Sequence, residues 1–527
     1  MQEFIIKNRE LGESLYSLYK NSSFPSGAEI LPSISGKLTC KIQNTFIHSG
    51  YDPVREATHF GDGKIEGKKI LFVLGMGLGY HIVELLKKTQ ALIVVIELCE
   101  EYFHLAYENV DLDFLHQVVY YIGRKDGLSN FLSELLVEES CTSAEILPLV
   151  SVTRLNPEGY NCVADIINRI LSQKIQSYMT TLGFGYRWIT NTLKNMTLLD
   201  SVISPVSQIK APVFILASGP SLDKALPYLK LMKRKGLVLC LSHSLARVLE
   251  EGFYPDAVLA IDGGYAVHSH FNLSKQDIKS VVLITALSVH PLVIRRWQGP
   301  IAIVHIDLPF EETVFLHALK IPVAGTVAAT AYRLARKISS APCYFAGLDL
   351  AFTGGRYHHS GSLAEENWIY NSGKLNTSQT LMKRAMRKFR VIEVAGRDGD
   401  NVLTNSAMNS YRLWFENEWQ GKEIYLLGHE GAEIKNAVVT DFSSLEKLPD
   451  IQCSLQFQEL EKDKKSINDK VQKIIWELEN HNIEEIQDEA IKMQFSRFRQ
   501  SKESDEPIIN KVKMLYRKIL NENDLRF

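Results

Sequence analysis

The sequence has few of the features that mark secreted, membrane and nucleic-acid-binding proteins. Its seven cysteines are dispersed and form no Cys-x-x-Cys pair, which argues against a disulfide framework or zinc cluster and for a reducing compartment. No apolar run approaches the ~20 residues of a membrane-spanning helix, and the first residues lack the apolar core of a secretory signal. The net charge of −2 gives no overall attraction to nucleic acid or anionic lipid. We therefore expect a cytoplasmic protein that binds neither.

The length of 527 residues exceeds what one hydrophobic core accommodates, and the predicted elements divide the chain into four parts. Strands and helices alternate in 1–160 and again in 211–440, which predicts two Rossmann-like, doubly wound α/β domains. Residues 161–210 show helical periodicity and few glycines, so we expect connecting helices there. Apolar residues at helical spacing amid dense Lys and Glu predict a C-terminal helical domain over 441–527. A further helix is expected over Phe4–Lys20.

The N-terminal domain contains a glycine-rich loop between a strand and a helix. The apolar strand 70–74 runs into Gly75, Gly77 and Gly79, and the next strand ends in Glu97. Rossmann-like domains hold a nucleoside with such glycines and bind its ribose hydroxyls with such an acid, as S-adenosylmethionine-dependent methyltransferases do. The spacing departs from Gly-x-Gly-x-x-Gly, which disfavours a dinucleotide. The alternative is a nucleotide-free scaffold whose glycines only permit tight packing.

The central domain is organised around the turn that follows the apolar strand 213–217. The turn residues Ser218, Gly219 and Pro220 end this strand, and Ser221 is a predicted N-cap of the next helix. A strand, a glycine turn and a helix start point backbone N–H groups and a positive dipole end at one spot. The segment therefore predicts a phosphate site, with an ordinary βα connection as the alternative.

Further polar residues follow other strands of this domain, where open α/β sheets bind ligands. The predicted strands span 213–217, 237–241, 257–261, 280–284, 301–306 and 343–347. Residues after their ends complete the predicted donor site: Ser242, Asp262, Gly325, Thr326, Gly347 and Asp349. No second acid follows Asp262, so we expect no metal there. We expect Asp349 mainly to fix its loop by accepting backbone N–H bonds.

The loop after Asp349 carries Arg356, Tyr357, His358 and His359, side chains that an apolar core does not need. An imidazole, with a reference pKa of about 6.5, accepts a hydroxyl proton near neutral pH. Arg356 and Tyr357 can donate to a departing phosphate oxygen in place of a metal. Adjacent histidines in an extended loop diverge, so they do not form a metal site. We predict that one histidine is a general base and the other is structural.

These segments, in this order, resemble the motility-associated factor (Maf) family of flagellin glycosyltransferases. The resemblance rests on Ser218–Leu222, Gly325–Ala328, Gly347–Phe352 and Tyr357–Gly361, with His48–Pro53 and Glu430–Ile434. It implies transfer of a nonulosonic acid, of pseudaminic or legionaminic type, from its CMP-activated form to Ser or Thr hydroxyls of flagellin in the cytoplasm. It implies no cofactor beyond this donor substrate.

The central domain of that family is similar to bacterial sialyltransferases that use CMP-sialic acid. By this resemblance the Gly-Pro-Ser-Leu turn cradles the CMP phosphate and Thr326 contacts the nucleotide. Tyr357 corresponds to one of two tyrosines that assist the leaving phosphate, and His358 or His359 corresponds to the base. The chain departs from the sialyltransferases where Ala351 replaces the second tyrosine, which leaves Arg356 as its substitute. It also departs at residue 218, where a serine replaces an asparagine.

Three other functions fit parts of the sequence. An archaeal group of 6-hydroxymethyl-dihydropterin diphosphokinases, which use ATP and Mg²⁺, is similar in the same Ser-Gly-Pro-Ser-Leu domain, although its chains are much shorter. A methyltransferase would act through the N-terminal glycine loop. A flagellin-binding factor without catalysis would use the N-terminal and C-terminal parts to hold its partner. The oligomeric state is left open.

Overall fold

The computed structural model describes most of the chain. The described residues are 27–109, 118–206, 208–273, 278–322, 325–419, 423–480, 488, 490–492 and 516. The chain divides into two compact units, Met1–Thr181 and Leu182–Phe527. Their boundary falls inside α7 (Pro157–Met196), so a single long helix takes the place of the several connecting helices that were expected. The helix expected over Phe4–Lys20 lies outside the described residues.

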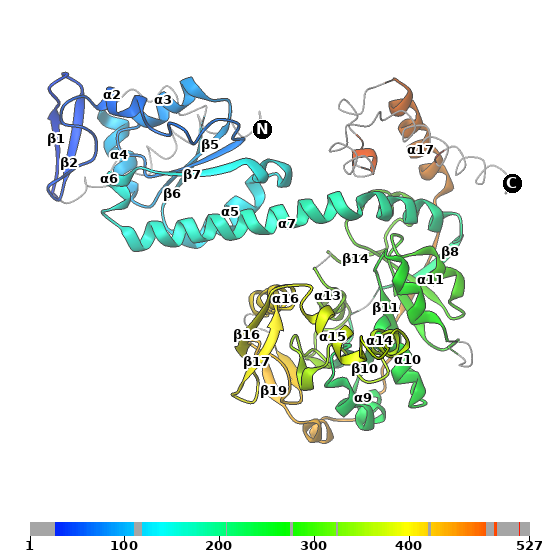
Figure 1. Cartoon of the computed structure of the whole chain (residues 1–527). Helices are drawn as coiled ribbons and strands as arrows, with labels where there is room; N and C mark the ends of the chain where they lie inside the picture. Colours follow the sequence, from blue (N-terminus) through cyan, green and yellow to red (C-terminus); the bar gives the residue numbers. More distant parts are fainter. Residues whose placement is uncertain are drawn as a thin grey trace. The chain divides into compact units, whose positions relative to one another are not determined.

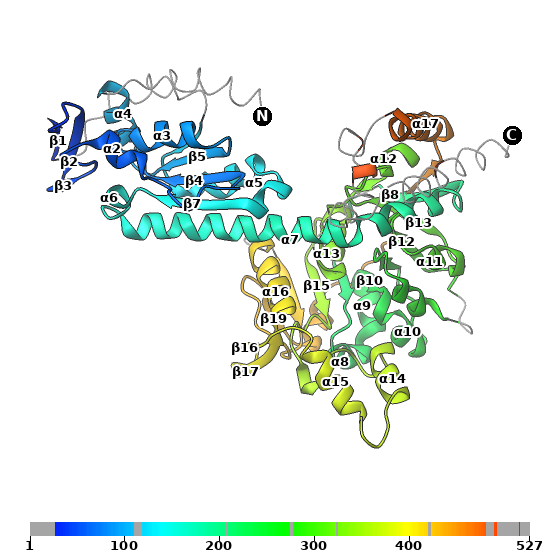
Figure 2. The same cartoon turned by 45° about the horizontal axis from the view of Figure 1, so that its top comes forward.

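The first unit contains a four-stranded parallel sheet in the order β6-β5-β4-β7 (Figures 1 and 2). Its strands are β4 (Ile70–Leu74), β5 (Leu92–Glu97), β6 (Val119–Ile122) and β7 (Ala144–Pro148), and a separate antiparallel sheet has β1 (Ala28–Pro32), β2 (Leu38–Ile42) and β3 (Thr45–Phe46). Its helices are α2 (Pro53–Thr58), α3 (Tyr80–Lys88), α4 (Glu100–Asn109), α5 (Leu128–Leu135), α6 (Val150–Thr153) and the first part of α7.

Both faces of this sheet are covered, as a parallel sheet requires. Every residue of β4 is buried. Because side chains alternate along a strand, Phe72 packs in the core with α5 and α7, whereas Val73 packs in the core with α3. This doubly wound arrangement confirms the predicted fold class for the first unit.

The second unit is built on an eleven-stranded sheet in the order β19-β18-β15-β9-β10-β11-β12-β13-β8-β20, with β14 paired to β13. The strands are β8 (Ser201–Pro205), β9 (Val213–Leu216), β10 (Leu237–Leu241), β11 (Ala257–Ala260), β12 (Val282–Thr285), β13 (Ile301–His305), β14 (Leu319–Lys320), β15 (Cys343–Ala346), β18 (Ile424–Leu427), β19 (Val438–Thr440) and β20 (Phe457–Glu461). All pairs are parallel except β20 with β8. A second Rossmann-like sheet is therefore confirmed.

Helices cover both faces of this sheet. They are α8 (Leu222–Ala225), α9 (Leu229–Lys235), α10 (Ser242–Glu250), α11 (Pro291–Arg296), α12 (Glu311–Val314), α13 (Val327–Ile338), α14 (Leu363–Tyr370), α15 (Ser378–Met386), α16 (Ser406–Glu418) and α17 (Lys464–Asn480). Ile215 of β9 packs with α13 and α16, and Phe214 packs with α8 to α10 on the other face. Figure 2 shows α14 and α15 side by side, and the hairpin β16 (Val391–Ala395)–β17 (Asn401–Asn405) beside α16.

The predicted C-terminal helical part, 441–527, packs on the second unit where its residues are described. β20 adds an edge strand to the central sheet. Ile467, Val471 and Ile474 of α17 are buried in the same core as Phe214 of β9. The apolar spacing of α17 was read correctly, but its partner is the second unit itself. Within the described ranges, no helix combines the length and apolar character needed to cross a membrane.

Candidate active site

The turn after β9 and the loop after β15 meet at two glycines. The Gly219 N–H donates to the Gly347 carbonyl at 2.7 Å. A Cβ at Gly219 would lie 2.5 Å from that oxygen, and a Cβ at Gly347 would lie 2.5 Å from the Ala217 carbonyl. Any larger residue would force the two segments apart. The turn and the loop are therefore in direct contact, and the two glycines permit it.

Asp349 locks the same two segments together. Its carboxylate is buried, with 1% of its surface exposed, and accepts the Ser221 N–H at 2.9 Å and also the Ser221 hydroxyl. Burial raises the pKa of Asp349, and the Ser221 hydrogen bonds and nearby Arg397 oppose that rise. The expected structural role of Asp349 agrees with these contacts.

These contacts oppose the predicted phosphate cradle at Ser218–Ser221. The N–H groups of Gly219 and Ser221 bind Gly347 and Asp349, and Leu222 N–H binds the Gly219 carbonyl. Pro220 has no N–H group. The Ser221 side chain does not cap α8, which spans only four residues. The turn holds the loop, and the N–H groups of Gly219, Ser221 and Leu222 are therefore already bonded within the protein.

His358 and His359 both lie against this turn. The His359 N–H donates to the Ser218 carbonyl at 3.1 Å, and the His358 Nδ1 lies 3.3 Å from the same oxygen. The two ring nitrogens of His359 face the carbonyls of Ser360 and His243, at 2.9 and 3.2 Å. A neutral imidazole has one donor and one acceptor nitrogen. Both ring nitrogens of His359 thus face hydrogen-bond acceptors. His358 donates to the Ser218 carbonyl through Nδ1, and its Nε2 therefore carries the lone pair that can accept a proton.

His358 belongs to a cluster of imidazoles. The His243 ring centroid lies 4.2 Å from that of His358 and 4.8 Å from that of His270, whose Nδ1 is 3.2 Å from the Ser242 hydroxyl. His243 directly follows β10, and His270 lies in the 3₁₀ helix η5 (Tyr265–Phe271) after β11. The sequence prediction included Ser242 but neither of these histidines. His243 could have been identified from the sequence, because it lies just after the buried strand β10.

Burial keeps this cluster uncharged near neutral pH. Burial, reinforced by neighbouring imidazoles, lowers the pKa of His243 to about 2 and of His358 to about 4. Burial also lowers the pKa of His270 to about 4, although the nearby Asp262 carboxylate opposes this shift. Asp262 otherwise accepts the Gly264 N–H at 2.7 Å. No group of three or more His, Cys, Asp or Glu in the described ranges is arranged to hold a metal ion.

Arg356, the predicted donor to the leaving phosphate, is paired with an acid of the chain itself. Its guanidinium donates to the Asp223 carboxylate at 3.0 Å and to the Ser360 hydroxyl. The Ser360 N–H also donates to Asp223, at 3.2 Å. Arg356 therefore fastens the histidine loop to α8, and an arginine held by a carboxylate is a poor substitute for a phosphate-binding tyrosine.

A tyrosine that the sequence analysis missed lies beside Tyr357. Burial and the neighbouring Tyr357 raise the pKa of Tyr411, which belongs to α16. A Cβ at Gly325 would lie 3.8 Å from the Tyr411 ring. Tyr357 in turn has its ring centroid 4.8 Å from that of His358. Tyr411 therefore lies next to Gly325, Tyr357 lies next to His358, and Thr326 is the N-cap of α13.

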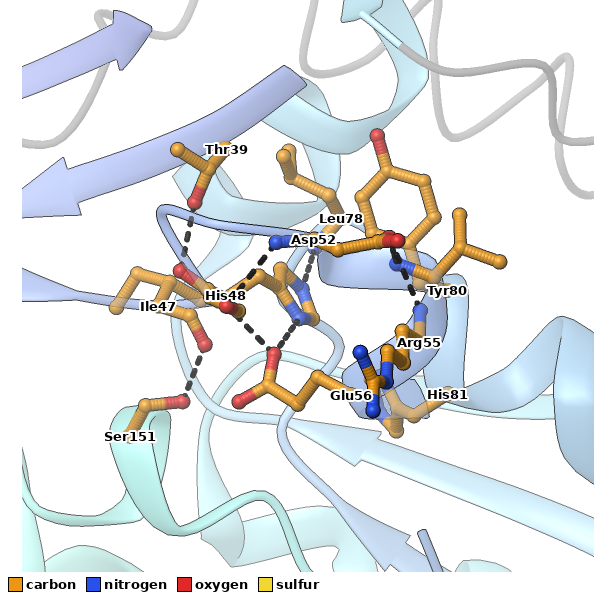
Figure 3. A network of polar contacts seen from close by, with 12 residues as sticks. Thr39, Ile47, His48, Asp52, Arg55, Glu56, Leu78, Tyr80, His81 and Ser151 are labelled. Carbon is orange, nitrogen blue, oxygen red and sulfur yellow. Dashed lines mark hydrogen bonds and ion pairs between the residues drawn. The ribbon is translucent and has the colours of Figure 1, made fainter. Parts of the chain in front are cut away.

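The glycine loop of the first unit is filled by the chain's own side chains. His48 is buried, and its Nε2 accepts the Leu78 N–H at 2.9 Å (Figure 3). A Cβ at Gly77 would lie 2.5 Å from that nitrogen. A Cβ at Gly75, whose φ is +93°, would lie 2.8 Å from the Val152 side chain. The glycines make room for these side chains, and Gly79, with φ +81°, begins α3.

Glu97, the predicted ribose ligand, is fully buried and already bonded. It accepts the N–H groups of Met76 and Cys99 and the Tyr160 hydroxyl, at 2.8, 3.0 and 2.7 Å. Burial raises its pKa, and these hydrogen bonds oppose the rise. The contacts favour the alternative of a nucleotide-free scaffold and oppose a nucleoside site at Gly75, Gly77, Gly79 and Glu97.

The whole chain has the α/β fold of a known class of glycosyltransferase. It is similar to the structure of the Maf glycosyltransferase from Magnetospirillum magneticum AMB-1 over 99% of this chain and 91% of that one, with a TM-score of 0.57 and 13% identity. Residues 187–355 match the family model described as 6-hydroxymethylpterin diphosphokinase MptE-like.

Two uncharacterized proteins of Treponema pallidum (strain Nichols) are each 28% identical to parts of the chain. The matches extend over 195 and 183 residues and cover 31% and 33% of this chain. The chain spans 49% and 39% of the length of these curated relatives.

The His48 contact predicts a stability effect. His48→Ala leaves the buried Leu78 N–H without its acceptor, so the free energy of unfolding should fall by about 1–3 kcal/mol, as measured by urea denaturation. The control is His59→Ala in the same unit, because His59 is 74% exposed and should change stability little. Equal effects of the two substitutions would contradict this role for His48.

The histidine cluster predicts a loss of stability in acid. Between pH 6.5 and about 4 the unfolded chain binds protons on His243, His270 and His358 that the folded chain does not bind, so stability falls as pH falls. His243→Gln should reduce the slope of unfolding free energy against pH by up to one proton, about 1.4 kcal/mol per pH unit. His429→Gln, at an exposed histidine, is the control. An unchanged slope in His243→Gln would refute the assignment.

Proposed function

We propose that the chain is a glycosyltransferase that uses His358 as its general base. The observation that carries this proposal is the position of His358, whose Nδ1 is tied to the Ser218 carbonyl while Nε2 keeps its lone pair. The imidazole lies at the carboxyl edge of the sheet, where α/β proteins bind ligands. Its pKa of about 4 leaves it unprotonated at neutral pH. The shared fold of the Maf glycosyltransferase supports the same reaction class.

In the proposed reaction, Nε2 of His358 takes the proton of an acceptor hydroxyl. The hydroxyl oxygen then forms a bond to the anomeric carbon of the donor sugar. The bond from that carbon to the phosphate oxygen breaks, and the nucleotide leaves with the bonding electron pair. The positioned base accounts for about 10²–10⁴-fold of the rate in reactions of this kind.

The leaving phosphate needs hydrogen-bond donors close to the base. The start of α13 is our candidate, because no acceptor within the described ranges binds the N–H groups of Val327 and Ala328. A helix N-terminus stabilises a phosphate through such N–H groups and the helix dipole. Tyr357 and Tyr411 would add two hydroxyl donors beside it. Tyr411 would thereby donate to the leaving phosphate oxygen, the role that was predicted for Arg356.

For the substrates, we infer a CMP-activated nonulosonic acid as donor and the Ser or Thr hydroxyls of flagellin as acceptor. This assignment is supported by the order of the segments Ser218–Leu222, Gly347–Phe352 and Tyr357–Gly361 along the sequence. No metal or further cofactor enters the proposed chemistry. The reaction is placed in the cytoplasm, where flagellin subunits would meet the enzyme before export.

A pterin diphosphokinase is the second candidate, because the matched family model bears that description. The match ends at residue 355, however, immediately before Arg356, Tyr357 and His358. The matched part therefore contains the sheet from β9 to β15 but not the loop that carries the proposed base. A non-catalytic flagellin-binding protein would have no need of His358 at all.

The proposed base predicts different outcomes for the two adjacent histidines. His358→Gln should lower transfer by about 10²–10⁴-fold without weakening CMP binding, as measured by intact mass of flagellin and by titration calorimetry. His359→Gln is the matched control, because both nitrogens of His359 face carbonyls, and it should lower transfer less. Wild-type transfer by His358→Gln would overturn the assignment.

Nucleotide preference separates the two candidate enzymes. CMP should raise the thermal unfolding temperature, and EDTA should leave that increase intact, because the proposed phosphate contacts come from protein N–H and hydroxyl groups. ATP with Mg²⁺ should have less effect. Stabilisation by ATP with Mg²⁺ and none by CMP would instead support the diphosphokinase.

A further inference from the structure

A pocket apart from the His358 site lies at the carboxyl edge of the sheet in the second unit. It has a volume of about 340 Å³ and is lined chiefly by Tyr186, Arg187, Thr190, Lys194, Tyr265 and His290. Four of these residues come from α7 after Leu182, and the other two follow β11 and β12. None belongs to the site around His358.

The floor of this pocket is fixed by buried amides of α7. The Asn191 side chain donates to the carbonyls of Gly263 and Ser288, both at 3.0 Å. Asn195, one turn further along the helix, donates in the same way to Leu287 and Val289 at 2.7 and 2.8 Å. A Cβ at Gly263 would lie 2.9 Å from the Trp188 ring, so the glycine lets helix and loop approach. The pocket is thus formed before any ligand arrives.

The charges lining the pocket have one sign. Arg187 and Lys194 are exposed, and neither forms an ion pair with a carboxylate in the described part of the chain. Burial lowers the pKa of His290, and the nearby His268, Lys194 and Arg187 lower it further. Elsewhere in the same unit, exposed cations such as Lys233 do pair with acids. An anion entering this pocket would meet two cations without displacing a carboxylate from either.

The remaining lining groups suit a sugar. Tyr265 is 66% exposed and, with Tyr186, offers ring surface against which a saccharide face can pack. The Thr190 Oγ1 is buried and has no hydrogen-bond partner among the described residues. An unsatisfied buried hydroxyl is costly, and a ligand hydroxyl would satisfy it.

We propose that this Arg187 pocket binds an anionic sugar, with Arg187 and Lys194 holding its carboxylate or phosphate and Tyr186, Thr190 and Tyr265 contacting its ring and hydroxyls. The inference is independent of the proposed transfer reaction, since binding needs no donor nucleotide. The helix η5 contributes to both sites, because its Tyr265 lines this pocket beside His290 and its His270 belongs to the histidine cluster.

The test is direct titration of the full chain with two probes, N-acetylneuraminic acid and glucose 1-phosphate. Each is compared with its uncharged counterpart, the methyl ester and glucose. The inference expects at least one charged sugar to bind at least about 10-fold more tightly than its counterpart, and the better probe distinguishes a carboxylate from a phosphate ligand. The double variant Arg187→Gln with Lys194→Gln should lose this preference.

The control double variant, Lys230→Gln with Arg390→Gln, removes two exposed cations outside the pocket and should bind like the wild type. Thermal unfolding shows that each variant is folded, and CMP binding reports separately on the proposed donor site. The inference is overturned if neither charged sugar binds, if the Arg187 and Lys194 variant binds as well as the wild type, or if inorganic phosphate binds as tightly as glucose 1-phosphate.

Discussion

The contact between the backbones of Gly219 and Gly347 determines where the loop after β15 can go. Two adjacent parallel strands end there, and the missing Cβ atoms let their exits touch. The buried Asp349 then closes the contact by binding Ser221. Because the loop leaves β15 in this direction, His358 and His359 fall on the Ser218 carbonyl. The Gly219 and Ser221 N–H groups donate to Gly347 and Asp349 in this contact, so these two groups are not available to a phosphate. A strand–glycine–helix turn can therefore serve a site by holding a loop rather than by touching the ligand.

The sequence predicted the six strands β9 to β13 and β15 well, because these are short apolar runs that are mostly buried, as in β10 and β13. The other strands of this sheet, β8, β14, β18, β19 and β20, were not among the predictions. It also predicted that strand ends would assemble a site, since parallel strands share one edge. It failed where partners are distant in sequence. His270 and Tyr411 join the site through the positions of η5 and α16, and no local pattern reports such contacts. Arg356 had the right chemistry, but its partner, Asp223, was 133 residues away.

Glycine motifs in the two units resemble each other in sequence but differ in use. In the first unit, Gly77 makes room for His48, and the Leu78 N–H that could have bound a ligand binds this imidazole instead. In the second unit, Gly219 makes room for a neighbouring loop. In both cases a strand–glycine–helix segment predicts correctly that something lies close to the backbone. Whether that neighbour is a ligand or the protein itself depends on residues far along the chain, which is why the motif alone could not decide between them.

The low pKa of His358 bears on how a base at this position would work. An imidazole with a pKa of about 4 is unprotonated at pH 7, but it is a weaker base than one whose pKa lies near the operating pH. Burial is the largest cause of that shift, and a negative phosphate beside the ring would oppose it by favouring the charged imidazolium. An anionic donor would therefore strengthen the base as it binds. Without the donor such a base would stay weak, so it would take the proton efficiently only when the leaving group is in place.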